Sequence, residues 1–212
     1  MTVLLDNKNQ GKVSDALKEN IQPDSRLSII SGLFSIYGYA ALKRELGRIE
    51  AVRLLLPLSH ASNEAPFQLN GLVGTAVDRR FRNSLNIAQV ARECAEWLEK
   101  KAAVRAVFIP VSQNLFHIQN ANGNAAAIHG SSQFTSAGLG VVPSAGYEMN
   151  TLLTTPLETS TLLNWFNSIW DNPDATQDIK TFVLAQVQEL FRAKSPERIY
   201  FLTLYNVFRD FL

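Results

Sequence analysis

The stretch FHIQNANGNAAAIHGSSQFTSAGLG, residues 116–140, determines how the rest of this sequence is interpreted. Within it, Asn122 and Gly123 form a turn dipeptide of the kind that joins two short β-strands. One histidine, His117, precedes the turn, and a Gly-Ser-Ser run at residues 130–132 follows it. This order predicts a β-hairpin that carries a phosphate-binding site. The stretch contains no Asp, Glu, Lys or Arg, which indicates that a phosphate bound there is not readily cleaved.

The length and composition are those of a globular protein. At 212 residues with 46% hydrophobic residues, the chain is long enough for one domain with a full core, or one domain with a helical extension. The formal net charge of +1 excludes an overall field that draws the chain onto nucleic acid or membrane, so binding to a polyanion requires a local basic patch. Cys94 is the single cysteine, which excludes an internal disulfide and a four-cysteine zinc site.

Targeting and cofactor motifs are absent from the sequence. The N-terminus has no secretory signal pattern, and no apolar run is long enough to span a bilayer, so we expect a cytoplasmic protein without a membrane partner. The three histidines are not spaced like metal ligands, so we expect no metal. Gly11 and Lys12 lack the glycine five positions earlier that a phosphate-binding loop requires, so we expect no nucleotide cofactor.

Apolar periodicity alternates between the patterns of strands and helices. We expect strands near residues 26–32, 50–56, 104–109 and 147–153 besides the hairpin, and helices near 13–21, 34–46, 87–101, 160–170 and 178–193. This alternation is typical of an α/β layered domain with a mixed central β-sheet flanked by helices. We expect that domain over residues 1–155. Residues 156–212 are then a helical extension that packs on it or leads to a further domain.

The order of these features resembles the phospholipase D superfamily, particularly its nuclease-like branch. Members combine a His-x-Lys pair, an Asp, and a Gly-Ser turn with an Asn. The resemblance puts His117 at the position of the nucleophile, with Gln119 where the Lys is expected and Asn124 roughly where the Asp is expected. The hairpin is about one residue shorter than the family's.

The turn and the strand after it extend the resemblance. Residues 130–135 resemble the Gly-Ser-Ser-Asn-Phe-Thr turn of the family, with Ser131 and Ser132 retained and Gln133 in place of the Asn. Glu148 and Asn150 resemble the Glu-x-Asn strand that supports the site. The resemblance therefore implies a site in which the turn and the histidine remain, and three polar groups are changed.

Both ends of the chain carry a second resemblance. Residues 4–46 look like the N-terminal module of bacterial helicase-linked phospholipase D-like proteins, and so do the tail segments NWFNSIW and SPERIYFLTLYNVF. In such proteins the tail leads into a helicase core of the SNF2 or DEAD-box type. The resemblance implies a helicase domain in the same or a neighbouring chain, in a restriction or defence setting.

The chemistry of the family shows what the substitutions change. In an intact site the His attacks phosphorus and forms a phosphohistidine, and a second His protonates the leaving oxygen. The Lys offsets charge on the phosphate, whereas Gln119 carries none. Loss of one such preorganised group costs about 10²–10³ in rate. The resemblance therefore implies a degenerate site.

Three hypotheses follow. The first is a degenerate domain that binds or positions DNA or another nucleic acid. The second is an active, metal-independent DNA phosphodiesterase that forms its site as a homodimer, with His117 from each chain across a two-fold axis. The third is a dimerisation or scaffold module without nucleic-acid binding. Arg79, Arg80 and Arg82 form the densest basic run, and they fit phosphate contacts and a solvated loop equally well.

Overall fold

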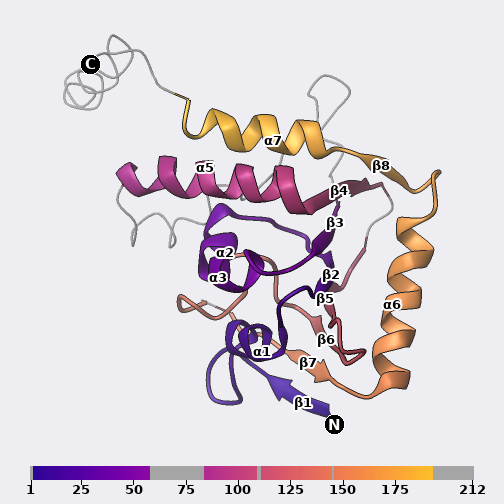
Figure 1. The fold of residues 1–212 in the computed structure, drawn as a ribbon. Helices are drawn as coiled ribbons and strands as arrows, with labels where there is room; N and C mark the ends of the chain where they lie inside the picture. Colours follow the sequence, from indigo (N-terminus) through magenta and orange to yellow (C-terminus); the bar gives the residue numbers. More distant parts are fainter. Residues whose placement is uncertain (1, 58–83, 109–110, 145, 193–212) are drawn as a thin grey trace.

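A mixed β-sheet forms the centre of the protein (Figure 1). The computed structural model describes residues 2–57, 84–108, 111–144 and 146–192. Over those residues the sheet has eight strands in the order β1-β7-β6-β5-β2-β3-β4-β8. Strands β2, β3 and β4 run parallel, and every other pair of neighbours is antiparallel. The strands are β1 (Thr2–Leu5), β2 (Arg26–Ile30), β3 (Ala51–Pro57), β4 (Ala102–Val107), β5 (Asn114–Gln119), β6 (Ala125–Gly130), β7 (Asn150–Leu153) and β8 (Thr176–Asp178).

Helices cover both faces of this sheet. One face carries the larger apolar core, to which most of the described helices contribute, and α6 is the described helix that lies against the other face (Figure 1). The described helices are α1 (Val13–Asn20), α2 (Ile36–Ala41), α3 (Lys43–Leu46), α5 (Ser84–Lys101), α6 (Pro156–Trp170) and α7 (Lys180–Glu189). The predicted α/β class with a mixed sheet is therefore confirmed.

Strand alternation decides which side chains face α6. On β2, Leu27 and Ile29 belong to the larger core, whereas Ile30 packs with Phe166 of α6. On β5, Phe116 belongs to the larger core in the same way. Successive side chains of a strand point to opposite faces, so Ser28 and His117 lie on the α6 side. Both are at most 4% exposed, which makes them polar groups in the smaller core.

Some helices and strands begin or end at other residues than the sequence predicts. The helix expected over 34–46 is interrupted at Leu42, whose ψ of 13° separates α2 from α3. The strand expected from residue 147 begins only at Asn150. The edge strands β1 and β8 were not predicted, because each is short and its pattern carries little signal. The sequence also predicts a loop over residues 57–74 and a helix from residue 195. Pro57 is the last residue of β3, and the rest of both segments lies outside the described residues.

The segment expected to be a helical extension is more closely integrated with the sheet than predicted. Strand β8 pairs with β4 and forms one edge of the sheet. Helix α7 packs against α5, and α6 contacts β2, β5 and β6. The described residues after 155 thus contribute a strand to the sheet and helices to its faces, and the domain boundary at residue 155 stays a prediction. No described helix is both long and apolar enough to cross a membrane.

Candidate functional site

The Gly-Ser-Ser turn lies where β6 ends and the chain approaches β7. A Cβ atom on Gly130 would stand 2.2 Å from the carbonyl oxygen of Met149, so no other residue fits there without a backbone shift. Ser131 donates to the carboxylate of Glu148, and its hydroxyl accepts from the backbone N–H of Met149 at 3.0 Å. The first serine of the turn is therefore held by the segment just before β7.

The second serine, Ser132, is buried in a network of amides. Its hydroxyl accepts from Asn150 Nδ2 at 2.8 Å and from Asn7 Nδ2 at 3.1 Å. Its backbone N–H donates to Asn150 Oδ1 at 2.9 Å, and Asn150 Nδ2 also donates to the carbonyl of Leu5 at 3.3 Å. The turn thus ties β1, β6 and β7 together. Its hydrogen-bonding groups are largely engaged by the protein itself.

Two further amides of this network could not be read from the sequence. Asn7 donates to the carbonyl of Gly138 at 2.8 Å and accepts from the backbone of Val13. Asn114 accepts from the backbone of Gly32 at 2.8 Å and donates to the carbonyl of Ser131 at 2.9 Å. Asn7 lies 125 residues from Ser132, so no local pattern signals the contact.

His117 lies apart from this turn. In the hairpin register Asn114 faces Gly130, whereas His117 faces Ala127. Three residues of strand therefore separate His117 from the level of the turn, which is about 10 Å. Its side chain is 1% exposed and lies on the face covered by α6. The structure does not bring the expected nucleophile to the serines.

The surroundings of His117 keep it neutral. Burial, and to a lesser degree the positive charge of Arg53, lower its pKa from 6.5 to about 4, against a smaller opposing effect of the Thr159 backbone. Within the described residues neither ring nitrogen has a hydrogen-bond partner. An unpartnered buried imidazole is costly, because each polar nitrogen has given up its bonds to water.

The remaining predicted residues divide between the two ends of the hairpin. Gln119 donates weakly to the carbonyls of Gly123 and Asn124, at 3.3 and 3.5 Å. Asn124 is exposed, and its backbone donates to the side chain of Asn122. Gln133 is half-buried beside Gly32 at the other end. The structure therefore brings together Ser131, Ser132, Glu148 and Asn150 near Gln133, and leaves Gln119 and Asn124 at the hairpin turn.

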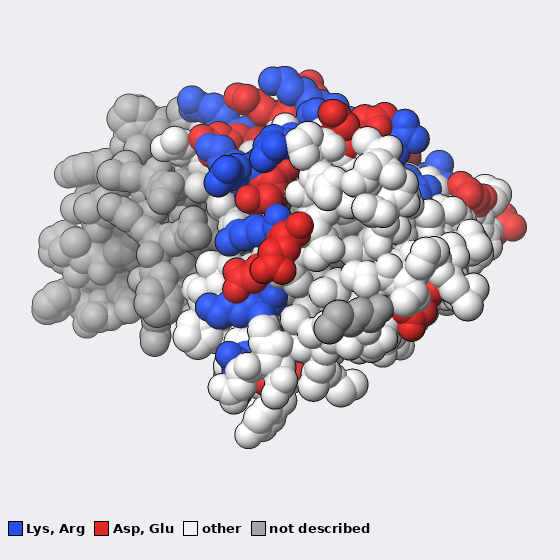
Figure 2. All heavy atoms as spheres, turned by 60° about the horizontal axis from the view of Figure 1, so that its bottom comes forward, with Lys and Arg blue, Asp and Glu red and all other residues white. Residues whose placement is uncertain are grey.

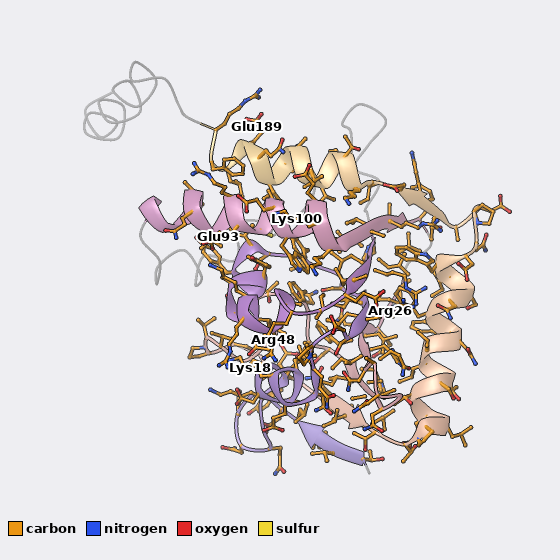
Figure 3. All side chains as sticks on the ribbon, in the orientation of Figure 1. Lys18, Arg26, Arg48, Glu93, Lys100 and Glu189 are labelled. Atoms are coloured by element: carbon orange, nitrogen blue, oxygen red, sulfur yellow. The ribbon has the colours of Figure 1, made fainter. Side chains whose placement is uncertain are left out.

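A cavity of about 520 Å³ opens beside His117, between the sheet and α6. Arg53 on β3 reaches over it, donates to the hydroxyl of Ser28 at 2.8 Å, and stacks on the ring of Phe166 at 4.7 Å. Arg26 and Glu50 lie at its open end. Figure 3 shows Arg26 on the side of the sheet that faces α6. The cavity is lined by Arg26, Leu27, Ser28, Glu50, Ala51, Arg53, His117, Gln119 and Leu163.

Charge on one face of the described part of the protein is mixed in sign. Figure 2 shows one face on which Lys and Arg alternate with Asp and Glu in a band, rather than forming a broad basic area. Arg79, Arg80 and Arg82 lie outside the described residues. No cluster of three or more His, Cys, Asp and Glu suited to a metal ion occurs in the part of the chain that the structure describes.

Comparison with known proteins identifies the fold. No family model matches the sequence, and no curated protein matches it. Among solved structures, phosphatidylserine synthase from Haemophilus influenzae Rd KW20 matches with a TM-score of 0.50 and 8% identity, over 89% of this chain and 43% of that one. The similarity supports an α/β fold with a mixed sheet and flanking helices. At this identity the similarity extends to the fold alone.

Two further structures of phospholipase D-fold proteins are similar. NucT from Helicobacter pylori matches with a TM-score of 0.45 and 13% identity, over 84% of this chain and 98% of that one. The yeast tyrosyl-DNA phosphodiesterase matches with a TM-score of 0.45 and 14% identity, over 82% of this chain and 38% of that one. The chain spans less than half the length of the synthase and of the yeast enzyme.

Proposed function

We propose that this chain is a phospholipase D-fold domain that does not cleave phosphodiesters and acts as a nucleic-acid-binding or positioning module. The observation that carries the proposal is the separation of His117 from the Gly-Ser-Ser turn. The family's chemistry needs both at one phosphorus atom. Here the histidine is 1% exposed beneath α6, and the two are about 10 Å apart along the strand.

Geometry makes catalysis at the turn unfavourable. A reacting nucleophile must approach its target to about 3–3.5 Å. Ser131 is engaged by Glu148, a carboxylate that would repel a phosphate placed against it. Gln119, the counterpart of the family's Lys, lies at the opposite end of the hairpin. None of these groups supplies positive charge to a transition state at the turn.

The nucleic-acid part of the proposal is supported by the sequence. The hairpin resembles the nuclease-like branch of the superfamily, and Arg79, Arg80 and Arg82 provide a local concentration of positive charge. Because one face of the described part of the protein is mixed in charge, we expect weak binding with a steep dependence on salt. A helicase domain in the same or a neighbouring chain remains the partner we propose.

A binding assay with matched variants tests this function. Anisotropy of labelled single- and double-stranded DNA is measured at low and at physiological salt, for the wild type and for a triple variant with Arg79, Arg80 and Arg82 changed to Ala. The control is the triple variant of Lys18, Arg48 and Lys100, three exposed cations distant in sequence from the run (Figure 3). We expect loss of binding in the first and retention in the second. No association at low salt overturns the proposal.

The active-enzyme alternative is tested on the same samples. We expect no cleavage of DNA in the presence of chelator at any pH. Cleavage that disappears in His117→Ala would establish the phosphodiesterase hypothesis instead. The homodimer stays a prediction, and sedimentation across a range of concentrations checks it. A dimer that shares two His117 side chains requires each to leave its site beneath α6.

A further inference from the structure

We infer that the cavity between β2, β3, β5 and α6 binds a small oxyanion of the phosphate type, held by Arg53 and His117. This site lies on the α6 face of the sheet, away from the Gly-Ser-Ser turn. It involves neither the serines nor Glu148. The inference is therefore independent of the function proposed above.

Strand register builds the polar side of this cavity. Ser28 on β2 pairs with Arg53 on one side and with His117 on the other. The three side chains form one row across three neighbouring strands, and they point to the same face. They interrupt an otherwise apolar layer, in which Ile30, Leu55 and other residues pack against α6. Polar groups buried in such a layer cost free energy unless a hydrogen-bonding partner, such as a bound ligand, compensates them.

His117 is the residue of this row whose polar atoms lack hydrogen-bond partners among the described residues. It lines the cavity and is 1% exposed, and within the described residues both ring nitrogens have no hydrogen-bond partner. A neutral imidazole offers one N–H donor and one acceptor. A protonated phosphate oxygen can donate to the acceptor, and an ionised one can accept from the donor. A phosphate therefore matches the unpartnered groups better than a carboxylate, which only accepts.

Arg53 supplies the charge. Its guanidinium is half-buried, and burial lowers its pKa, against a smaller opposing effect of the Asp171 carboxylate. Over the described residues no carboxylate forms an ion pair with it, and the hydroxyl of Ser28 is one acceptor for a group with five N–H donors. Stacking on Phe166, with the ring of Trp170 also nearby at 5.6 Å, orients the guanidinium. A bound anion would compensate the burial of this charge.

The mouth of the cavity is consistent with anion entry. Arg26 and Glu50 stand there as an ion pair of 2.7 Å, with side chains 70% and 49% exposed. The carboxylate of Glu50 is thus already neutralised. The volume of about 520 Å³ is that of a small-ligand site. A second cavity of about 500 Å³ shares Gln119 and Leu163 with it, which leaves room for the rest of a phosphorylated molecule.

The site is tested by titration with inorganic phosphate. Ring ¹⁵N resonances of His117, assigned with the variants His60→Gln and His129→Gln, are followed at fixed ionic strength. We expect saturable shifts and a rise in the pKa of His117, because a nearby anion stabilises the imidazolium. Acetate under the same conditions is expected to shift the ring much less. If phosphate leaves the His117 resonances unchanged, the inference is wrong.

Variants of Arg53 distinguish specific phosphate binding at this cavity from non-specific effects of added ions. Arg53→Gln removes the charge and is expected to weaken phosphate binding by about tenfold or more. Arg53→Lys keeps the charge and should retain more of the affinity, provided both variants keep the wild-type amide spectrum. Arg48→Gln removes an exposed charge and should bind phosphate normally. Equal affinity in Arg53→Gln and wild type overturns the inference, even when His117 responds to phosphate.

Discussion

His117 on β5 and Arg53 on β3 flank Ser28 in a single row across the sheet. The positive charge of Arg53 adds to the effect of burial and disfavours the charged form of the imidazole. A histidine close enough to feel the positive charge of Arg53 is poorly suited to stabilise the imidazolium that a phosphotransfer step requires. The same pair is well suited to hold an anion between its members.

The first prediction concerns the pH dependence of stability. The folded-state pKa of His117 is about 4, below its ordinary value of 6.5. Between these values the unfolded chain binds a proton that the folded chain does not, so the free energy of unfolding decreases as pH falls. The total decrease from this group is about 3 kcal/mol, complete near pH 4.

Chemical denaturation from pH 7 to pH 4, in buffers without phosphate, measures this decrease. The variant His117→Gln should lose this part of the pH dependence. His129→Gln, on the neighbouring strand, is the matched control and should keep it. Identical slopes in His117→Gln and wild type would contradict the assignment.

The second prediction concerns the amide network around Ser132. Asn150 is 1% exposed and makes hydrogen bonds to the Ser132 backbone, the Ser132 hydroxyl and the carbonyl of Leu5. Asn150→Ala leaves buried polar groups unpaired and should lower the free energy of unfolding by about 3 kcal/mol. Urea denaturation measures it. Asn164→Ala, at an exposed position of α6, should change stability by less than about 0.5 kcal/mol.

The third prediction concerns the packing of α2 against the segment after the turn. A Cβ on Gly38 would lie 2.5 Å from the carbonyl oxygen of Phe134. In an open helix Gly→Ala stabilises by about 1 kcal/mol, but here the added methyl must displace backbone. Gly38→Ala should therefore destabilise by about 2–3 kcal/mol. Gly146→Ala, which meets nothing within 4 Å, should leave the unfolding midpoint nearly unchanged.

The fourth prediction concerns the thiol of Cys94. The residue is fully buried in α5, and burial raises the pKa of its thiol. Because the thiolate is the reactive form, a disulfide reagent should modify the native protein at least about 100-fold more slowly than the urea-unfolded protein. Absorbance of the released thiolate measures both rates. Rapid labelling of the native protein would show that α5 opens readily, against this expectation.

The folding class and much of the element order follow from local patterns. The short β-rich apolar runs of β2 and β3 predict strands, and the dipeptide Asn122 and Gly123 identifies the hairpin turn. Such signals depend on a few adjacent residues, so they can be read from the sequence without the tertiary structure. The edge strands β1 and β8 were missed because three or four residues carry too little pattern, and pairing with β7 and β4 completes them.

The candidate site was predicted only in part. The family resemblance groups Ser131 and Ser132 with Glu148 and Asn150, and hydrogen bonds join these residues in the structure. The roles proposed for these residues and for His117 remain predictions. Spacing along the chain could not reveal how far His117 lies from the Gly-Ser-Ser turn in space. That distance depends on which residues of β5 and β6 face each other, which is the register of the hairpin.

By itself, the sequence determined an α/β domain and a hairpin around residue 123 that is followed by a Gly-Ser-Ser run. Only the tertiary structure decided that His117 shares a row with Ser28 and Arg53, and that Asn7 completes the network around Ser132. The reason is physical. Turn and strand preferences act over neighbouring residues, whereas register, burial and cavities arise when distant segments compete to bury apolar surface and pair their polar groups.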